Sequence, residues 1–515
     1  MESSATTAPA APVAIDRSAP GQKGLKTGAI GYVSNVVIGV ASTAPAYSLA
    51  TTLGFIVAVP GLGTHAPAVL IVAFIPMLFI SFAYRYLNLA DPDAGTTFAW
   101  TTRAMGPQMG WINGWAIVIA DVIVMASLAD IASTYTFSLV GWTSAQNSTT
   151  AIIIGCVIWI VLMTWICYRG IELSAHIQTA LLSIECAILG IFSVVALINT
   201  YSGLHGSVKP QFDWFNPFNL SATAFTGGIL LAIFIYWGWD SGVAVNEESE
   251  NSAEGPGRAA VLSTILLVLI YVLVAVAAQA DHGTSFLSNN QNDVLSVLGK
   301  RVFGGGILDK LLLFSVLTSA SASTQTTILP TARTTISMAS WGALPKVFAR
   351  CHPRFKTPSV STLAMGGISI VWTVALLLTS SPNNALGDSI TGLGFSILFY
   401  YGFTGLACAI YFRRELFKSV RRFIFVGLVP FAGFGGMAYV FVKSFFTVSY
   451  QKDYNYSAPV AGVQLPIVVG IGGLLLGLIF LAAQWIFMPD FFKRKPQVAD
   501  PAILDEHFAA HHHPA

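Results

Sequence analysis

Residues 222–249 are apolar for most of their length, but they carry three acids and two glycines near their end: Asp240, Glu247, Glu248, Gly238 and Gly242. Such a stretch cannot be a plain membrane-spanning helix, because charged groups are costly in hydrocarbon and glycine frees the backbone to unwind. Unwound backbone is tolerated at membrane depth only where protein or water surrounds it. We therefore expect this stretch to border a cavity.

The rest of the chain predicts an all-α polytopic membrane protein. It is 54% hydrophobic and only 10% charged, whereas soluble proteins are about 25% charged. A net charge of +2 is too small to indicate a nucleic-acid partner. Segments of about the 20 residues that a bilayer requires occur twelve times, at 29–58, 66–86, 110–140, 151–168, 174–198, 222–249, 260–280, 306–339, 360–379, 389–412, 423–446 and 465–487.

The distribution of basic residues predicts the orientation. With the N-terminus inside, 20 of the 26 Lys and Arg residues fall in inner loops and tails, which is the usual bias of membrane proteins. We expect a multi-pass protein of the plasma membrane with both termini in the cytoplasm. Residues 1–28 form a predicted disordered tail, 29–488 the membrane domain, and 489–515 a second cytoplasmic tail.

The first predicted helix is interrupted in the same manner as the sixth, by glycine and proline between Gly39 and Ser48. Paired interrupted helices in corresponding parts of a chain are a sequence sign of a transporter's substrate site. The breaks should lie near Ser42–Ala46 and near Phe234–Trp237.

The chain resembles the amino acid–polyamine–organocation (APC) permeases from Gly31 to Phe487. The resemblance rests on the two interrupted helices and on the order and spacing of several shorter runs: DPDAGTTFAW from Asp91, GWINGW from Gly110, RGIELSAHIQ from Arg169, the Glu247-Glu248 pair followed by Pro256-Gly-Arg258, and Arg333 leading to Leu344-Pro345 and Thr357-Pro358.

The resemblance implies a LeuT-like fold of two inverted five-helix repeats, about 29–198 and 222–412, in which helices 1 and 6 are broken. Two further helices would follow at about 423–487. It also implies transport of amino acids or related amines by alternating access.

Physical chemistry assigns complementary charges to the two breaks. Free N–H groups at the start of the second half of helix 1 attract a carboxylate, and free carbonyls at the end of the first half of helix 6 attract an ammonium. The predicted substrate-binding residues at the breaks are Ala41, Ser42, Thr43, Ala44, Phe234, Ile235, Tyr236, Trp237 and Asp240. Pro45 supplies no N–H where relatives often carry a glycine-rich run, which also leaves room for amines that lack a carboxylate.

Further candidates are a substrate-side acid and a gate. Asp130 could recognise a cationic group, or bond only to neighbouring helices. The resemblance favours Phe234 as a gating aromatic, with core packing as the alternative. Glu247 and Glu248 should form inner-gate ion pairs with an arginine such as Arg333 or Arg258; a solvated helix end is the simpler reading.

Glu185 is the predicted coupling residue. In several relatives a lysine occupies this place on helix 5, seven residues after the glutamine that matches Gln178, and its amine stands where related carriers bind sodium. Here a carboxyl group faces a hydroxyl stripe on helix 8 that includes Ser319 and Ser323. It could be protonated or could hold a cation, whereas the stripe alone could simply permit close helix packing.

Together these features predict a proton-coupled secondary transporter of amino acids or related amines, with sodium as the alternative coupling ion. Its partners would be a small-molecule substrate, the ion and the lipid bilayer, without cofactor or metal. A carrier or exchanger of polyamines or other organic cations is the second possibility, and a transport-inactive nutrient receptor the third. No nucleophile and base pair or zinc motif indicates an enzyme.

Overall fold

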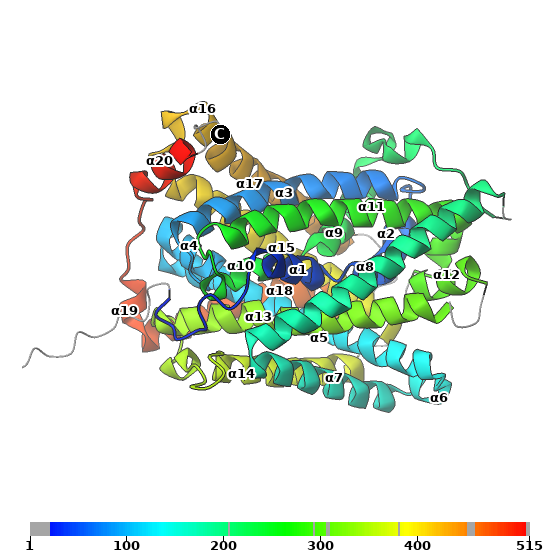
Figure 1. The fold of residues 1–515 in the computed structure, drawn as a ribbon, viewed down its shortest axis with the longest axis horizontal. Helices are drawn as coiled ribbons and strands as arrows, with labels where there is room; N and C mark the ends of the chain where they lie inside the picture. The colour runs from blue at the N-terminus through cyan, green and yellow to red at the C-terminus, as the bar shows by residue number, and fades with distance from the viewer. Residues whose placement is uncertain are drawn as a thin grey trace, which may run out of the picture.

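A computed structural model of the chain shows an almost wholly helical protein (Figure 1). It describes residues 21–203, 206–291, 294–304, 309–379, 382–450 and 459–510. The long helices are α1 (Tyr32–Thr43), α2 (Pro45–Ala58), α3 (Ala66–Ala90), α5 (Pro107–Val140), α7 (Thr149–Arg169), α8 (Ile171–Tyr201), α9 (Ala222–Tyr236), α11 (Gly255–Asn289), α13 (Asp309–Ser340), α14 (Ser359–Thr379), α15 (Pro382–Tyr411), α17 (Val429–Tyr450) and α18 (Leu465–Phe487).

Short helices connect or follow the long ones. The α-helical pieces are α4 (Thr97–Met105), α6 (Thr143–Gln146), α10 (Ser241–Ala244), α12 (Val294–Val302), α16 (Val420–Arg422), α19 (Pro489–Phe492) and α20 (Pro501–Ala510). Tighter 3-10 turns are η1 (Phe212–Phe215), η2 (Pro217–Asn219), η3 (Asn246–Glu248), η4 (Lys346–Ala349) and η5 (Leu416–Lys418), and η6 (Phe423–Leu428) is a π-helical turn. Among the described residues strand pairing is limited to isolated bridges, one of which joins Ile30 to Ser249.

Eleven helical segments of the described chain are long and apolar enough to cross a membrane, one fewer than the sequence predicts. The difference is α13, which has 32 residues but is rich in Ser and Thr. Its hydroxyl groups bond to carbonyls of the same helix, as Thr318 does to Ser315 and Thr324 to Ala320. Because α13 packs between α5, α8, α1 and α14, these polar side chains face protein. By position and length α13 matches the eighth predicted span, 306–339.

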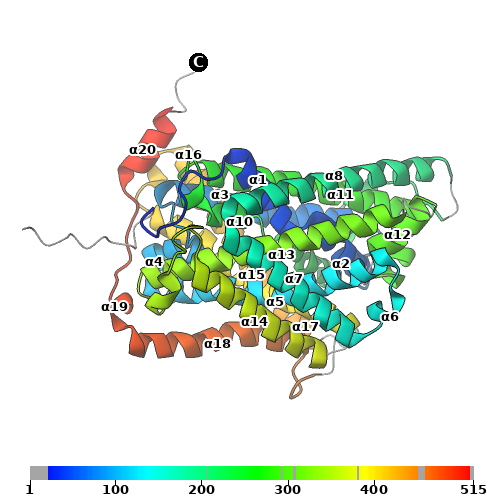
Figure 2. The ribbon, with the colours of Figure 1, turned by 60° about the horizontal axis from the view of Figure 1, so that its bottom comes forward.

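The two interrupted helices occupy the centre of the bundle. The apolar window of α1 and α2 is 89% buried, whereas that of α18 is only 28% buried. In Figure 1, α1 and α10 lie among the longer helices α11, α13 and α8, and Figure 2 shows α18 at one edge of the bundle. The central segments therefore meet protein on all sides, as unwound backbone in a membrane requires.

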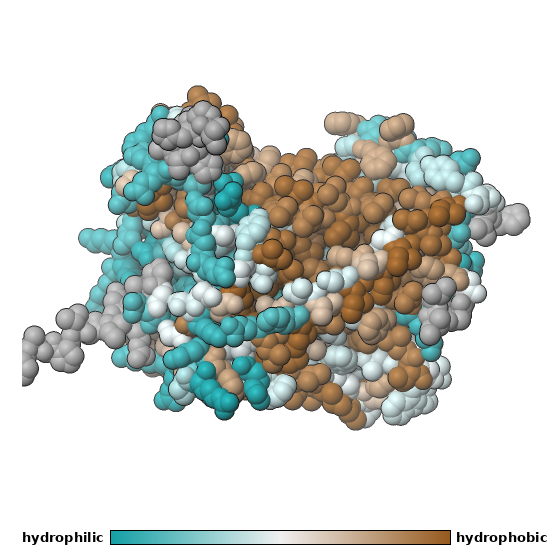
Figure 3. Space-filling model, in the orientation of Figure 1, coloured by the Kyte–Doolittle hydropathy of each residue, from teal (hydrophilic) through white to brown (hydrophobic). Residues whose placement is uncertain are grey.

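The surface of the bundle fits a membrane protein. On the face drawn in Figure 3, a band of hydrophobic residues lies between two ends that carry hydrophilic ones. Apolar side chains such as Ile154, Val371 and Ile486 are exposed on the outside of the bundle. The chain is thus a multi-pass membrane protein.

The end of the bundle at which residues 21–30 lie together with α4, α19 and α20 is called the basic end here (Figure 1). The predicted disordered tail lies outside the described residues up to residue 20. From Gly21 onward the chain packs on the bundle, and the side chains of Lys23 and Leu25 are buried.

Candidate functional site

The first break separates α1 from α2 at Ala44, inside the predicted interval. Ala44 has a left-handed backbone (φ 48°, ψ 69°), and its N–H bonds to the carbonyl of Ala41 at 3.1 Å. Pro45 then opens α2, where a missing N–H is tolerated. The carbonyl of Thr43, left free by the break, accepts the hydroxyl of Ser48 at 2.6 Å.

The second break follows Tyr236 and contacts the first. Gly238 has φ +116°, and a Cβ at this position would lie 2.9 Å from the carbonyl carbon of Ser42. Only glycine fits such a conformation and approach without strain. Across the contact the hydroxyls of Ser42 and Ser241 are hydrogen-bonded at 2.8 Å. The structure therefore brings the predicted substrate segments of both helices together.

Glu185 belongs to α8, and its fully buried carboxyl group lies against the start of α2. Its Oε1 accepts the N–H of Ala46 at 2.7 Å and the hydroxyl of Ser319 at 2.8 Å. The N–H of Tyr47 bonds in turn to the same Ser319 hydroxyl at 3.1 Å. The other carboxyl oxygen, Oε2, is buried and finds no hydrogen-bond partner within the described part of the chain. Glu185 and Ser319 are thus in contact, as their helical faces predict.

Ser323 belongs to the same arrangement from one turn further along α13. Its hydroxyl donates to the carbonyl of Ser42 at 2.8 Å. A series of hydroxyl and carboxyl groups therefore joins α8 and α13 to both breaks.

Asp240 lies just beyond the second break and is surrounded by tyrosines. Its Oδ1 accepts the hydroxyl of Tyr401 at 2.8 Å, and its Oδ2 accepts those of Tyr400 at 3.1 Å and Tyr84 at 3.4 Å. The indole N–H of Trp237 donates to the hydroxyl of Tyr400. The sequence analysis missed these tyrosines, although the adjacent Tyr400 and Tyr401 in an apolar segment are a weak signal.

The other aromatic candidates are buried in the bundle. Phe234 is 3% exposed. The hydroxyl of Tyr236 donates to the carbonyl of Leu70 at 3.0 Å, on α3. The carbonyl of Ile235 accepts the hydroxyl of Tyr271 at 2.6 Å, which satisfies one acceptor at the end of α9.

Asp130 is on α5, one turn beyond Ser127, whose hydroxyl bonds to that of Tyr47 at 2.8 Å. The Oδ1 atom of Asp130 is buried without a hydrogen-bond partner among the described residues. No hydrogen bond found in the described ranges joins Asp130 to either break. In the described ranges, the hydrogen bonds of Glu185 and Ser42 therefore do not include Asp130.

Two ion-pair groups lie at the basic end. Arg333 of α13 forms two hydrogen bonds to Glu248, at 2.9 and 3.0 Å, and both side chains are buried. Glu247 instead pairs with Lys23 at 2.5 Å, and Lys23 also contacts Asp93 at 2.9 Å. Lys23 is a functional candidate that the sequence analysis missed, because it lies in a stretch whose composition indicates disorder.

The environment of Lys23 sets the charges of its partners. Burial alone would raise the pKa of Asp93, but the Lys23 ammonium and the Ser337 hydroxyl reverse this effect and hold that pKa below its usual range. Burial and the nearby Asp93 carboxylate raise the pKa of Glu247 despite the same ammonium. As the pH falls, Glu247 is therefore the first of the two acids to take up a proton.

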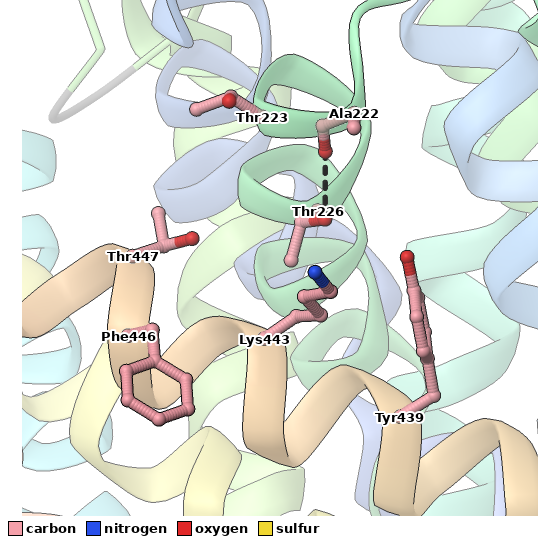
Figure 4. Close-up of a pocket in the computed structure, with 7 residues that line it drawn as sticks. All are labelled: Ala222, Thr223, Thr226, Tyr439, Lys443, Phe446 and Thr447. Atoms are coloured by element: carbon pink, nitrogen blue, oxygen red, sulfur yellow. Dashed lines mark hydrogen bonds between the residues drawn. The ribbon is translucent and has the colours of Figure 1, made fainter.

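A separate pocket of about 420 Å³ lies between α9 and α17. In Figure 4, Lys443 and Tyr439 of α17 lie opposite Thr226 and Thr223 of α9. The lining residues include none of the predicted site residues. This pocket therefore does not mark the contact between the two breaks.

Comparison with known proteins places this geometry in a family. The model of a family described as amino acid permeases matches residues 29–482. An uncharacterized transporter of Mycobacterium tuberculosis is 26% identical over 60% of this chain and 64% of its own length. The methylthioribose transporter of Bacillus subtilis is 23% identical over 60% and 67%, and the low-affinity putrescine importer of Escherichia coli is 20% identical over 60% and 66%.

The chain thus spans less than two thirds of the length of the mycobacterial relative that it matches. The family match, by contrast, covers well over half of this chain and includes both breaks. The protein, whose relatives are named as transporters and not as enzymes, therefore belongs to the amino acid permeases of the APC superfamily.

Proposed function

We propose that this protein is a secondary transporter that carries amino acids or related amines across the plasma membrane by alternating access, coupled to protons. The observation that carries the proposal is the contact of a buried carboxyl group, Glu185, with the start of α2 beside both helix breaks. The substrate would bind between the breaks, where backbone polar groups and Ser42 meet.

Glu185 can couple proton binding to movement because its bonds connect different helices. When ionised, its Oε1 accepts hydrogen bonds from α2 and from Ser319 of α13. A proton would enter at Oε2, the buried atom without a partner in the described ranges. It would remove the negative charge that strengthens these bonds. The attachment of α8 to α2 and α13 would then weaken, and the broken helices could move relative to α8 and α13. Sodium bound at the same oxygen is the alternative.

Ion pairs at the basic end would keep the inner pathway closed. Lys23 connects the N-terminal segment to η3 through Glu247 and to the loop before α4 through Asp93. Arg333 connects α13 to η3 through Glu248. An opening toward the cytoplasm would have to separate these partners.

The first prediction concerns the substrate position. Replacing Ser42 by Leu overpacks the contact with Gly238 and Ser241, at a cost of about 1–3 kcal/mol. Uptake of radiolabelled leucine, lysine and putrescine into proteoliposomes should fall by roughly tenfold or more. Size-exclusion chromatography should show a folded protein. The control is Ser183→Leu on the exposed side of α8, which should transport normally; normal uptake by Ser42→Leu would contradict the placement.

The second prediction concerns coupling. Glu185→Gln keeps an oxygen for the N–H of Ala46 but cannot be ionised, so an imposed pH gradient should no longer drive accumulation. Exchange of internal for external substrate should persist. Glu172→Gln, on the same helix with its side chain 49% exposed, should leave accumulation unchanged. Accumulation by Glu185→Gln with the pH dependence of the parent would show that another group carries the proton.

The third prediction concerns the basic end. Lys23→Met leaves two buried acids unpaired, and a broken buried ion pair costs about 3–5 kcal/mol. The cluster should open more often and expose Cys351, whose thiol donates to the carbonyl of Gly24 at 3.0 Å. Maleimide labelling of Cys351, followed by peptide mass spectrometry, should accelerate by roughly tenfold or more.

The matched control for this labelling experiment is Lys26→Met. Lys26 lies three residues away and forms an exposed ion pair with Glu172, and such pairs contribute only about 0–1 kcal/mol. Its labelling rate should stay close to that of the parent. Equal rates in all three proteins would mean that Lys23 does not hold this end closed.

A further inference from the structure

The backbone donors at the start of α2 are all occupied by the protein itself. Pro45 has no N–H, and the N–H of Ala46 bonds to Glu185 at 2.7 Å. The N–H of Tyr47 bonds to Ser319 at 3.1 Å, and that of Ser48 to the carbonyl of Ala44 at 2.8 Å. A helix start normally offers such groups to an anion, but here the anion is a side chain of the chain itself.

The second break also has a buried carboxyl group beside it, but that group is held by side chains and caps no backbone N–H of α10. The residue at the start of α10 is Asp240, whose carboxylate is held by the hydroxyls of Tyr84, Tyr400 and Tyr401. Asp240 is buried. A protein carboxyl group is therefore buried beside each break, although only that of Glu185 accepts a backbone N–H of the following helix.

A substrate carboxylate would be unfavourable beside these two groups. While Glu185 is ionised, the substrate carboxylate would bring a further negative charge into a buried region, where like charges repel strongly, and it would find no free N–H at the start of α2. Burying an ionised carboxylate without partners is costly.

Hydrogen-bond acceptors for a substrate ammonium group, in contrast, remain available. No hydrogen bond to the carbonyls of Tyr236 or Trp237 is found within the described part of the chain, and both lie at the end of α9, where the helix dipole favours a cation. The free Oε2 of Glu185 adds a further buried acceptor.

We infer that the substrates are organic amines without a carboxylate, and that Glu185 determines this specificity by taking the place of a substrate carboxylate at the start of α2. The inference rests on the proposed function as an amine or amino acid carrier and narrows its substrate class. Pro45 and Asp240 contribute, the first by removing a donor and the second by its charge.

The experiment compares amino acids with their decarboxylated counterparts. The purified full-length protein is titrated with three pairs, lysine and cadaverine, ornithine and putrescine, and leucine and 3-methylbutylamine. Binding is measured by isothermal calorimetry and by thermal shift. In at least one pair the amine should bind roughly tenfold or more tightly than the amino acid, a difference of about 1.4 kcal/mol.

Two variants test the role of the residues. Glu185→Gln removes the charge, so the ratio of the two affinities should approach one, mainly because the amino acid binds better. Pro45→Ala restores a backbone N–H at the first position of α2 and should improve binding of the amino acids without weakening the amines. Glu172→Gln, the exposed control on α8, should keep the ratio of the parent.

The outcomes separate this inference from the proposed function. If the parent binds amino acids as tightly as amines, or more tightly, the specificity inference is wrong while the transporter proposal stands. If none of the six compounds binds, the proposed substrate class is wrong as well. An unchanged ratio in both Glu185→Gln and Pro45→Ala would remove these residues from the explanation.

Discussion

Backbone polar groups inside a membrane protein must find partners within the protein, because hydrocarbon offers none. Each helix break creates such groups at the centre of the bundle, and the surrounding side chains are placed to meet them. Glu185 and Ser319 accept the N–H groups of Ala46 and Tyr47, and Tyr271 donates to the carbonyl of Ile235. Part of the polar character of α13 follows from the same constraint, since the hydroxyls of Ser319 and Ser323 bond to the backbone of the broken helix beside it.

The connections around the breaks extend in two directions. Toward α13, Ser323 bonds to the carbonyl of Ser42, and Ser42 bonds across to Ser241. Toward the basic end, α10 leads directly into η3, whose acids contact Arg333 and Lys23. Arg333 belongs to the same helix as Ser323 and Ser319. One helix, α13, thus contacts both the proposed substrate region and the ion pairs that would close the inner pathway, which gives a physical route for coupling the two.

The sequence predicts those features of the site that depend on local residue pattern and on helical spacing. The positions of glycine and proline predicted both breaks, because glycine permits unusual backbone conformations and proline interrupts a helix. The helical faces of α8 and α13 predicted the contact of Glu185 with Ser319. Contacts between residues far apart in sequence were missed. Lys23 lies 224 positions from Glu247 in a segment that reads as a tail, and Tyr400 lies 160 positions from Asp240. The segment 306–339, by contrast, was predicted as a span and is the helix α13, although its hydroxyl-rich composition keeps it out of the eleven apolar helices.

The two buried carboxyl groups beside the breaks differ in how their oxygens are used, and this difference assigns them different roles. Both oxygens of Asp240 accept tyrosine hydroxyls, so a proton on this group would displace a donor that is already in place. Glu185 uses only Oε1, and its Oε2 has no partner in the described part of the chain. A proton can enter there without breaking a hydrogen bond. Asp240 is therefore suited to a fixed negative charge that holds the second break and repels a substrate carboxylate, whereas Glu185 is suited to change its charge during a transport cycle.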